Sequence, residues 1–118
     1  MAELLKKNFE KDCALTEVPF AQLFTVEMPT GSITKQVAQP GWKWSTHIKP
    51  LVGTDLCEVA HFGFVAEGSL TILQDGVEMV YGAGDVFEMP SGHYGWVNGN
   101  QIAVVYEIAQ TNVLSHKN

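Results

Sequence analysis

The sequence is poor in positive charge and has no long hydrophobic run. Its 118 residues include 7 Lys and Arg against 13 Asp and Glu, so the formal net charge is −6. An acidic chain without a basic cluster argues against nucleic acid and anionic membranes as partners. No apolar stretch approaches the length that spans a bilayer, and the first residues lack the apolar core and cleavage site of a signal peptide. We therefore expect a soluble, cytoplasmic protein.

Cysteine is also scarce, which limits the covalent cross-links that the chain can form. The two cysteines, Cys13 and Cys57, allow at most one disulfide. In a reducing cytosol such cysteines are expected to be free thiols. A chain of this length makes one domain, and its 46% of hydrophobic residues supply one ordinary core.

The first fifteen residues differ in pattern from the rest. Leu5, Phe9 and Cys13 recur at i, i+4 and i+8 with lysines between them, which predicts a short amphipathic helix over residues 1–15. Such a helix is marginal alone, so it would dock on the domain or on a partner chain. A frayed arm is the alternative.

Residues 16–110 read as short strands separated by Gly, Pro and Asx turns, followed by a polar tail over residues 111–118. This rhythm is typical of an all-β antiparallel sandwich or barrel. The run Ile102–Ala109 is apolar on both faces, which predicts cover by the N-terminal helix or by a second subunit. We expect a homodimer. The expected strands are Val18–Val26, Ile33–Val37, Trp42–Lys49, Phe62–Ala66, Leu70–Leu73, Val77–Tyr81, Val86–Met89, Tyr94–Val97 and Ile102–Ala109.

The most specific motif lies between Tyr81 and His93. Gly84 permits a tight turn, and a Pro-Ser-Gly turn then delivers His93 to the start of the next strand. Gly84, Pro90 and Gly92 fit the second motif of the cupin family, although its histidine and asparagine positions hold Gly95 and Gly99.

An earlier segment resembles the first cupin motif. Gly41 with five residues before His47 fits its opening, Lys49 replaces its second histidine, and His61 stands where its glutamate belongs, six residues before Gly68. The resemblance covers about residues 31–108. It implies a cupin-type β-barrel, also called a double-stranded β-helix or jelly roll, with a metal pocket, but it assigns no activity.

The histidines and one cysteine are the candidate metal ligands. The resemblance suggests His47, His61 and His93, and Cys57 can join them as a thiolate. Zinc is the first choice because it accepts mixed imidazole and thiolate ligands without a carboxylate; iron, manganese, nickel or no metal stay open. The competing interpretations are a solvent-facing His47, a core His61 and a turn histidine at 93. Cys57 can also be a reactive thiol or a small buried hydrophobe.

Two tryptophans and a lysine are candidates for binding a small molecule. Trp44 and Trp96 can form an aromatic wall, and Lys49 can bind a carboxylate if its side chain points inward. One hypothesis is a metal-dependent enzyme acting on a small organic acid, sugar acid or phenolic compound. The other is a ligand-binding or sensor module without turnover, because a fold does not decide between them.

Overall fold

The N-terminal segment does not form the predicted helix. The structure, a computed structural model, describes residues 3–110. Residues 3–13 contain no helix, only one hydrogen-bonded turn in which the Asp12 N–H donates to the Asn8 carbonyl (2.8 Å), before the first strand begins. The backbone N–H of Glu10 donates to Asn8 Oδ1 (2.7 Å), and that of Asn8 to Asp12 Oδ2 (2.8 Å). These side-chain bonds close the turn at Asn8–Asp12, and the segment is too short to extend that turn into a stable helix alone. The predicted tail, 111–118, lies outside the described residues.

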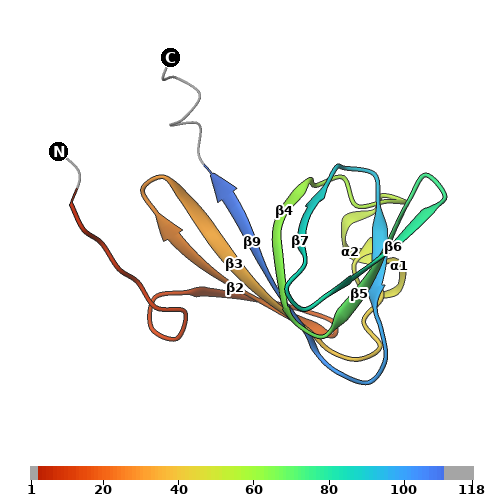
Figure 1. Ribbon diagram of the computed structural model, residues 1–118, viewed down its shortest axis with the longest axis horizontal. Coiled ribbons are helices and arrows are strands. Elements are labelled where there is room, and N and C mark those ends of the chain that lie inside the picture. Colours follow the sequence, from red (N-terminus) through yellow and green to blue (C-terminus); the bar gives the residue numbers. More distant parts are fainter. Residues whose placement is uncertain (1–2, 111–118) are drawn as a thin grey trace, which may run out of the picture.

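Within residues 3–110, nine antiparallel strands form two sheets (Figure 1). The larger sheet has the order β1-β2-β3-β9-β4-β7 and the smaller one the order β6-β5-β8. No ladder joins the two sheets into a closed barrel within residues 3–110, so the domain is an antiparallel sandwich. The strands are β1 (Ala14–Val18), β2 (Ala21–Met28), β3 (Gly31–Ala38), β4 (His61–Glu67), β5 (Ser69–Gln74), β6 (Val77–Gly82), β7 (Val86–Met89), β8 (Tyr94–Val97) and β9 (Ala103–Gln110).

The expected strand Trp42–Lys49 is wrong. This segment contains two single-turn helices, α1 (Trp44–His47) and α2 (Lys49–Val52). The backbone N–H of Lys43 donates to His47 Nδ1 (3.0 Å), so the histidine side chain satisfies a donor at the start of α1. Pro50 lies in the first turn of α2, where its missing N–H costs nothing. The described helices are too short to cross a membrane.

The core lies between the two sheets, and a two-residue hairpin turn at Asp75–Gly76 joins β5 to β6. Both turn residues have positive φ, 51° and 77°, as a two-residue hairpin of this kind requires. Trp44 is buried by the turn of α1. The core cluster consists of Ala21, Ala38, Val65, Leu70, Phe87, Met89, Val97, Ala103 and Val105.

Candidate metal centre

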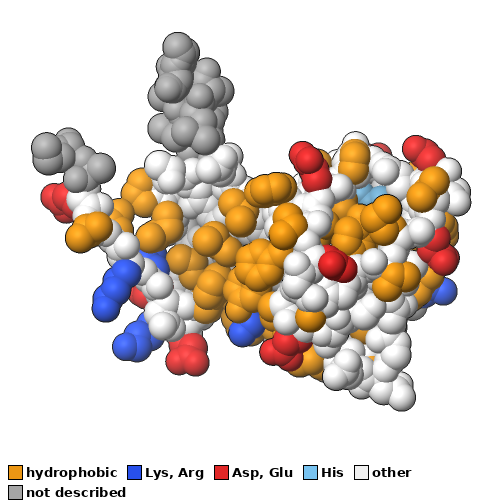
Figure 2. Space-filling model, viewed as in Figure 1, with side chains coloured by type: hydrophobic (Ala, Val, Ile, Leu, Met, Phe, Trp, Pro, Cys, Tyr) orange, Lys and Arg blue, Asp and Glu red, His pale blue; other side chains and the backbone are white. Residues whose placement is uncertain are grey.

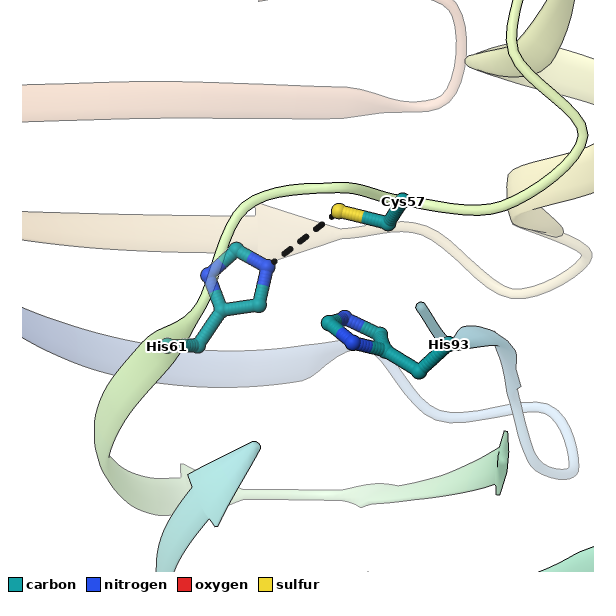
Figure 3. A group of neighbouring side chains, drawn as sticks. All are labelled: Cys57, His61 and His93. Atoms are coloured by element: carbon teal, nitrogen blue, oxygen red, sulfur yellow. Dashed lines mark hydrogen bonds between the residues drawn. The ribbon is translucent and has the colours of Figure 1, made fainter. Parts of the chain in front are cut away.

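Three side chains from separate segments meet at one end of the sandwich (Figure 3). His61 is the first residue of β4, His93 directly precedes β8, and Cys57 lies in the loop between α2 and β4. The Cys57 N–H donates to the His93 carbonyl (2.7 Å), and the Gly92 N–H donates to the Cys57 carbonyl (2.7 Å). These backbone bonds fix the loop to the strand that follows the Pro-Ser-Gly turn.

The donor atoms of the three side chains converge. One ligand atom from each of Cys57, His61 and His93 lies within 4.8 Å of the other two. Cys57 Sγ is 3.5 Å from His61 Nε2, and the two imidazole rings lie edge to face with centroids 5.0 Å apart. Imidazole nitrogen with thiolate sulfur is a donor set that suits zinc and other borderline metals, and three protein ligands leave a position open.

Each histidine is oriented by a bond from its other ring nitrogen. His61 Nδ1 donates to Glu107 Oε1 (2.6 Å), and Glu107 Oε2 accepts from Gln36 Nε2 (2.5 Å). His93 Nδ1 donates to the Pro90 carbonyl (2.7 Å). Both Nε2 atoms are therefore left for the centre of the group. Carboxylate and carbonyl partners of this kind orient metal-binding histidines and set their tautomer.

Without a metal, these contacts shift the protonation of Cys57 and His61. Burial disfavours the Cys57 thiolate, but hydrogen bonds from His61 and His93 outweigh it and lower the pKa of Cys57 from 9.0 to about 6. Burial also disfavours the His61 imidazolium, yet hydrogen bonds to Cys57 and Glu107 raise the pKa of His61 from 6.5 to about 9. At neutral pH the metal-free pair is thiolate and imidazolium.

The three side chains lie at the wall of a largely apolar cavity of about 210 Å³. The buried face of Trp44 contributes to this wall, as predicted for an aromatic pocket residue. No lysine lines the cavity among the described residues. The apolar lining comprises Val18, Ala21, Leu23, Ala38, Trp42, Trp44, Ile48, Leu70, Ile72, Phe87, Met89 and Val105.

The other sequence-predicted site residues lie outside this group. His47 stacks on Phe20 with ring centroids 4.2 Å apart. Its Nδ1 is engaged by the Lys43 N–H, because α1 turns the side chain back on its own N-terminus. Lys49 forms an exposed ion pair with Asp55 (3.0 Å) and does not line the cavity.

Trp96 is also separated from the cavity. It lines a shallow hollow on the surface, where the Lys43 ammonium lies 5.9 Å from its ring centroid. The predicted aromatic wall therefore consists of Trp44 and Trp42, and the latter was not among the sequence candidates.

Sequence reasoning missed Glu107 and Gln36, which support His61 from β9 and β3. The one available signal was that Glu107 is the only charged residue within the apolar run Ile102–Ala109. A lone carboxylate on a strand covered on both faces needs a buried partner.

Comparison with known proteins defines the fold. No protein-family model matches the sequence, and neither does any curated protein sequence. Among solved structures, KdgF from Halomonas sp. superposes with a TM-score of 0.61 at 18% identity, covering 97% of this chain and 99% of KdgF. The polyketide cyclase RemF from Streptomyces resistomycificus has a TM-score of 0.63 at 17% identity, with coverages of 91% and 80%.

The chain has a cupin fold. AerE from Microcystis aeruginosa is similar as well, with a TM-score of 0.61 at 15% identity. The match covers 84% of this chain but only 46% of AerE. The cupin resemblance seen in the sequence is thereby confirmed at the level of the fold. At these identities the likeness carries no activity from one protein to the other.

Proposed function

We propose that this cupin binds one divalent metal ion, zinc by preference, through Cys57, His61 and His93. The convergence of the three donor atoms within 4.8 Å is the observation that carries the proposal. The outer hydrogen bonds support it, because Glu107 and Pro90 leave both imidazole Nε2 atoms directed to the group. His47 is left out of this ligand set, since its ring stacks on Phe20 and its Nδ1 caps α1.

The proposed activity is metal-dependent chemistry on a small, mainly apolar compound such as a phenol. A bound metal would polarise an oxygen of the substrate or activate water. The chain itself contributes a largely apolar cavity of about 210 Å³, with Trp44 in the wall against the substrate. Sugar acids and other multiply charged acids fit less well, because Lys49 pairs with Asp55 outside the cavity. RemF, a polyketide cyclase of similar fold, supports an enzymatic role.

Metal content is the direct test. Untagged protein from metal-replete medium should carry one zinc per chain by elemental analysis, and His93→Ala and Cys57→Ala should carry none. His47→Ala is the matched control and should retain the metal. Turnover of a bound phenol that is lost on chelation identifies an enzyme, whereas tight binding without turnover identifies a ligand-binding module. Wild-type protein without stoichiometric metal would refute the site.

A second candidate function rests on the same cysteine acting as a nucleophile without metal. Cys57 Sγ lies 3.5 Å from His61 Nε2, and His61 Nδ1 lies 2.6 Å from Glu107 Oε1. In this arrangement Cys57 is the nucleophile, His61 is its base, and Glu107 orients the imidazole. Cys57 cannot serve both functions at once, because a thiolate bound to the metal is not free to attack a substrate. If zinc protects Cys57 from iodoacetamide, the thiol is a ligand; rapid alkylation in zinc-loaded protein favours the nucleophile.

We also propose that two copies pair through the outer face of the larger sheet. Phe64 and Tyr106 stack there with centroids 5.2 Å apart, and Phe62 and Val86 are 50% and 71% exposed beside them. Hydrophobic side chains also gather over the middle of the face seen in Figure 2. An exposed apolar patch of this kind marks an interaction surface.

Charge on the same face favours a second copy as the occupant. Lys35 pairs with Tyr106 in register, and Glu88 pairs with Phe62, so both charges share the face of the aromatic patch. Lys35 lies on β3 and Glu88 on β7, on opposite sides of β9 and β4. A two-fold axis through the aromatic centre would bring each Lys35 to Glu88 of the other copy.

A further inference from the structure

The edge strand β6 is open to pairing with a further strand. It ends the order β6-β5-β8, so no strand within residues 3–110 pairs with its outer side. Val77, Met79 and Val80 are 61%, 52% and 62% exposed, and β6 contains neither proline nor lysine. Edge strands are commonly protected by such residues, and an exposed apolar edge is a template for another strand.

The backbone of β6 shows which groups face outward. A two-residue turn joins Gln74 to Val77, so these two residues form a hydrogen-bonded pair. Hydrogen-bonded and non-bonded pairs then alternate along the regular antiparallel ladder. Met79 therefore bonds to β5, whereas Glu78 and Val80 direct their N–H and C=O groups to the outer edge.

A groove of about 260 Å³ lies beside this edge, between β6 and the segment that contains β7. Val77 and Met79 line it from β6, and Met89 and Pro90 line it from the other side. Met79 lies opposite Ile72 in the ladder, and Ile72 also lines the central cavity, so this face of β6 is directed between the two sheets. A strand added to β6 would therefore direct alternate side chains into a largely apolar groove.

The charged residues at this edge are acidic. Asp75 and Glu88 line the groove, which has no lysine among its described lining residues, and Glu78 is exposed on β6. Figure 2 shows hydrophobic and acidic side chains together on the part of the face that holds β6 and β7. Glu88 is the residue that we propose to meet Lys35 of a second copy, which leaves Asp75 and Glu78 for a different partner. A second copy of β6 would bring like charges together, so a basic partner fits better.

We propose that an extended segment of another protein, in which basic and apolar residues alternate, docks on β6 as a further strand. Its apolar side chains enter the groove beside Met79, and its basic side chains lie on the other face, opposite Glu78. Main-chain bonds to Glu78 and Val80 hold the segment, and the groove selects its side chains.

A labelled peptide tests the docking strand. Fluorescence anisotropy at low salt should show binding of the fluorescein-labelled pentapeptide Lys-Val-Lys-Val-Lys to the wild-type protein. N-methylation of its lysines removes the N–H groups that would face β6, and should weaken binding by about tenfold or more. N-methylation of its valines removes N–H groups that face away from β6, and should change the affinity by about twofold or less.

Two protein variants test the same contacts from the other side. Val80→Pro removes an N–H that faces outward without removing a bond of the β5–β6 ladder, and should weaken binding by about tenfold. Glu78→Lys should weaken binding by about fivefold, because like charges then lie opposite each other. Glu27→Lys, at an exposed position on β2, is the matched control with the same change of charge and should keep the affinity. Should Val80→Pro fold poorly, the N-methylated peptides give the same answer on the wild-type protein.

Several outcomes would overturn the proposal. If the peptide does not bind, or if both N-methylated forms lose affinity equally, no strand is added to β6. Equal weakening by Glu78→Lys and Glu27→Lys would reduce the binding to general attraction between opposite charges. Dissociation of a wild-type dimer by Val80→Pro would assign this edge to a second copy instead. None of these results depends on zinc content, so each leaves the proposed metal site standing.

Discussion

At the scale of single residues, folding moves one proton between Cys57 and His61 in the metal-free protein. In the unfolded chain the proton sits on Cys57, with a pKa of 9.0, while His61 with a pKa of 6.5 is mostly neutral at pH 7.5. In the folded protein the pKa of Cys57 falls to about 6 and that of His61 rises to about 9, so His61 holds the proton. Both states bind the same number of protons near neutral pH.

This exchange sets the signs of the pH dependence. The depressed pKa of Cys57 gives stability that is present above pH 9.0 and lost as the pH falls toward about 6. The raised pKa of His61 gives stability that is present below pH 6.5 and lost as the pH rises through about 9. The two slopes oppose each other, so this pair leaves the free energy of unfolding nearly flat between these values.

The pH dependence of Cys57 reactivity should therefore reveal the thiolate–imidazolium pair, which the free energy of unfolding does not reveal. In metal-free Cys13→Ser protein, where Cys57 is the only cysteine, the rate of alkylation by iodoacetamide should rise with pH to a plateau, with a midpoint near pH 6. Stopped samples analysed by mass spectrometry give this profile. Adding His61→Gln removes the imidazolium and should move the midpoint upward by more than one pH unit. A midpoint near 9.0 in the parent protein would contradict the thiolate–imidazolium pair.

At the scale of the elements, the pairing of β4 with β9 positions the site. Gly63 lies opposite Glu107 in the ladder, and His61 shares the inward face with Gly63. A Cβ on Gly63 would lie 2.9 Å from Glu107 Cα and collide with the neighbouring Tyr106 carbonyl. The missing side chain at position 63 lets β9 approach closely enough for Glu107 to reach His61.

Gly63→Ala should disturb stability and metal binding together. We expect a loss of about 1–3 kcal/mol of unfolding free energy, because the two strands must separate to admit the methyl group. Zinc affinity should also fall by about 10-fold or more, as for other losses of an orienting partner. Denaturant unfolding and competition with a chelator measure the two effects. Gly82→Ala is the control: its Cβ meets only Asp85 Oδ2 at 4.0 Å, so both quantities should hardly change. Unaltered zinc affinity in Gly63→Ala would contradict the positioning role of this ladder.

The same ladder shows what the sequence was able to predict. His61 and His93 could be singled out as candidates because motif spacing counts residues along the chain, and each lies beside its own turn. Glu107 could not, because it reaches His61 across 46 residues through strand pairing that no local pattern encodes. The segment Trp42–Lys49 was assigned to a strand by its side-chain pattern. It is helical instead: the Lys43 N–H donates to His47 Nδ1 at the start of α1, and Pro50 lies in the first turn of α2.

At the scale of the whole molecule, the two-sided apolar strand β9 requires explanation. Its inward face supplies Ala103, Val105 and Glu107 to the core and the site, while its outward face carries Tyr106. The predicted N-terminal helix is absent from residues 3–13, and Phe9 of that segment packs on Tyr106 with ring centroids 5.7 Å apart. Phe62 and Phe64 beside it are exposed and form part of the face through which we propose that two copies pair.

Sedimentation of charge-reversal variants tests the proposed dimer and its two-fold arrangement. The wild-type protein should sediment as a dimer at micromolar concentration, and Phe64→Asp as a monomer, because a carboxylate would be buried in the aromatic centre. Val80→Asp, at a 62% exposed position on the smaller sheet, is the control and should stay dimeric. Lys35→Glu should weaken the dimer by placing two like charges together, and adding Glu88→Lys should restore it, since the reversed pair attracts again. A monomeric wild-type protein would refute the interface. A dimer that dissociates in Phe64→Asp but is unaffected by the charge reversal would support this face as the interface and exclude the two-fold pairing of Lys35 with Glu88.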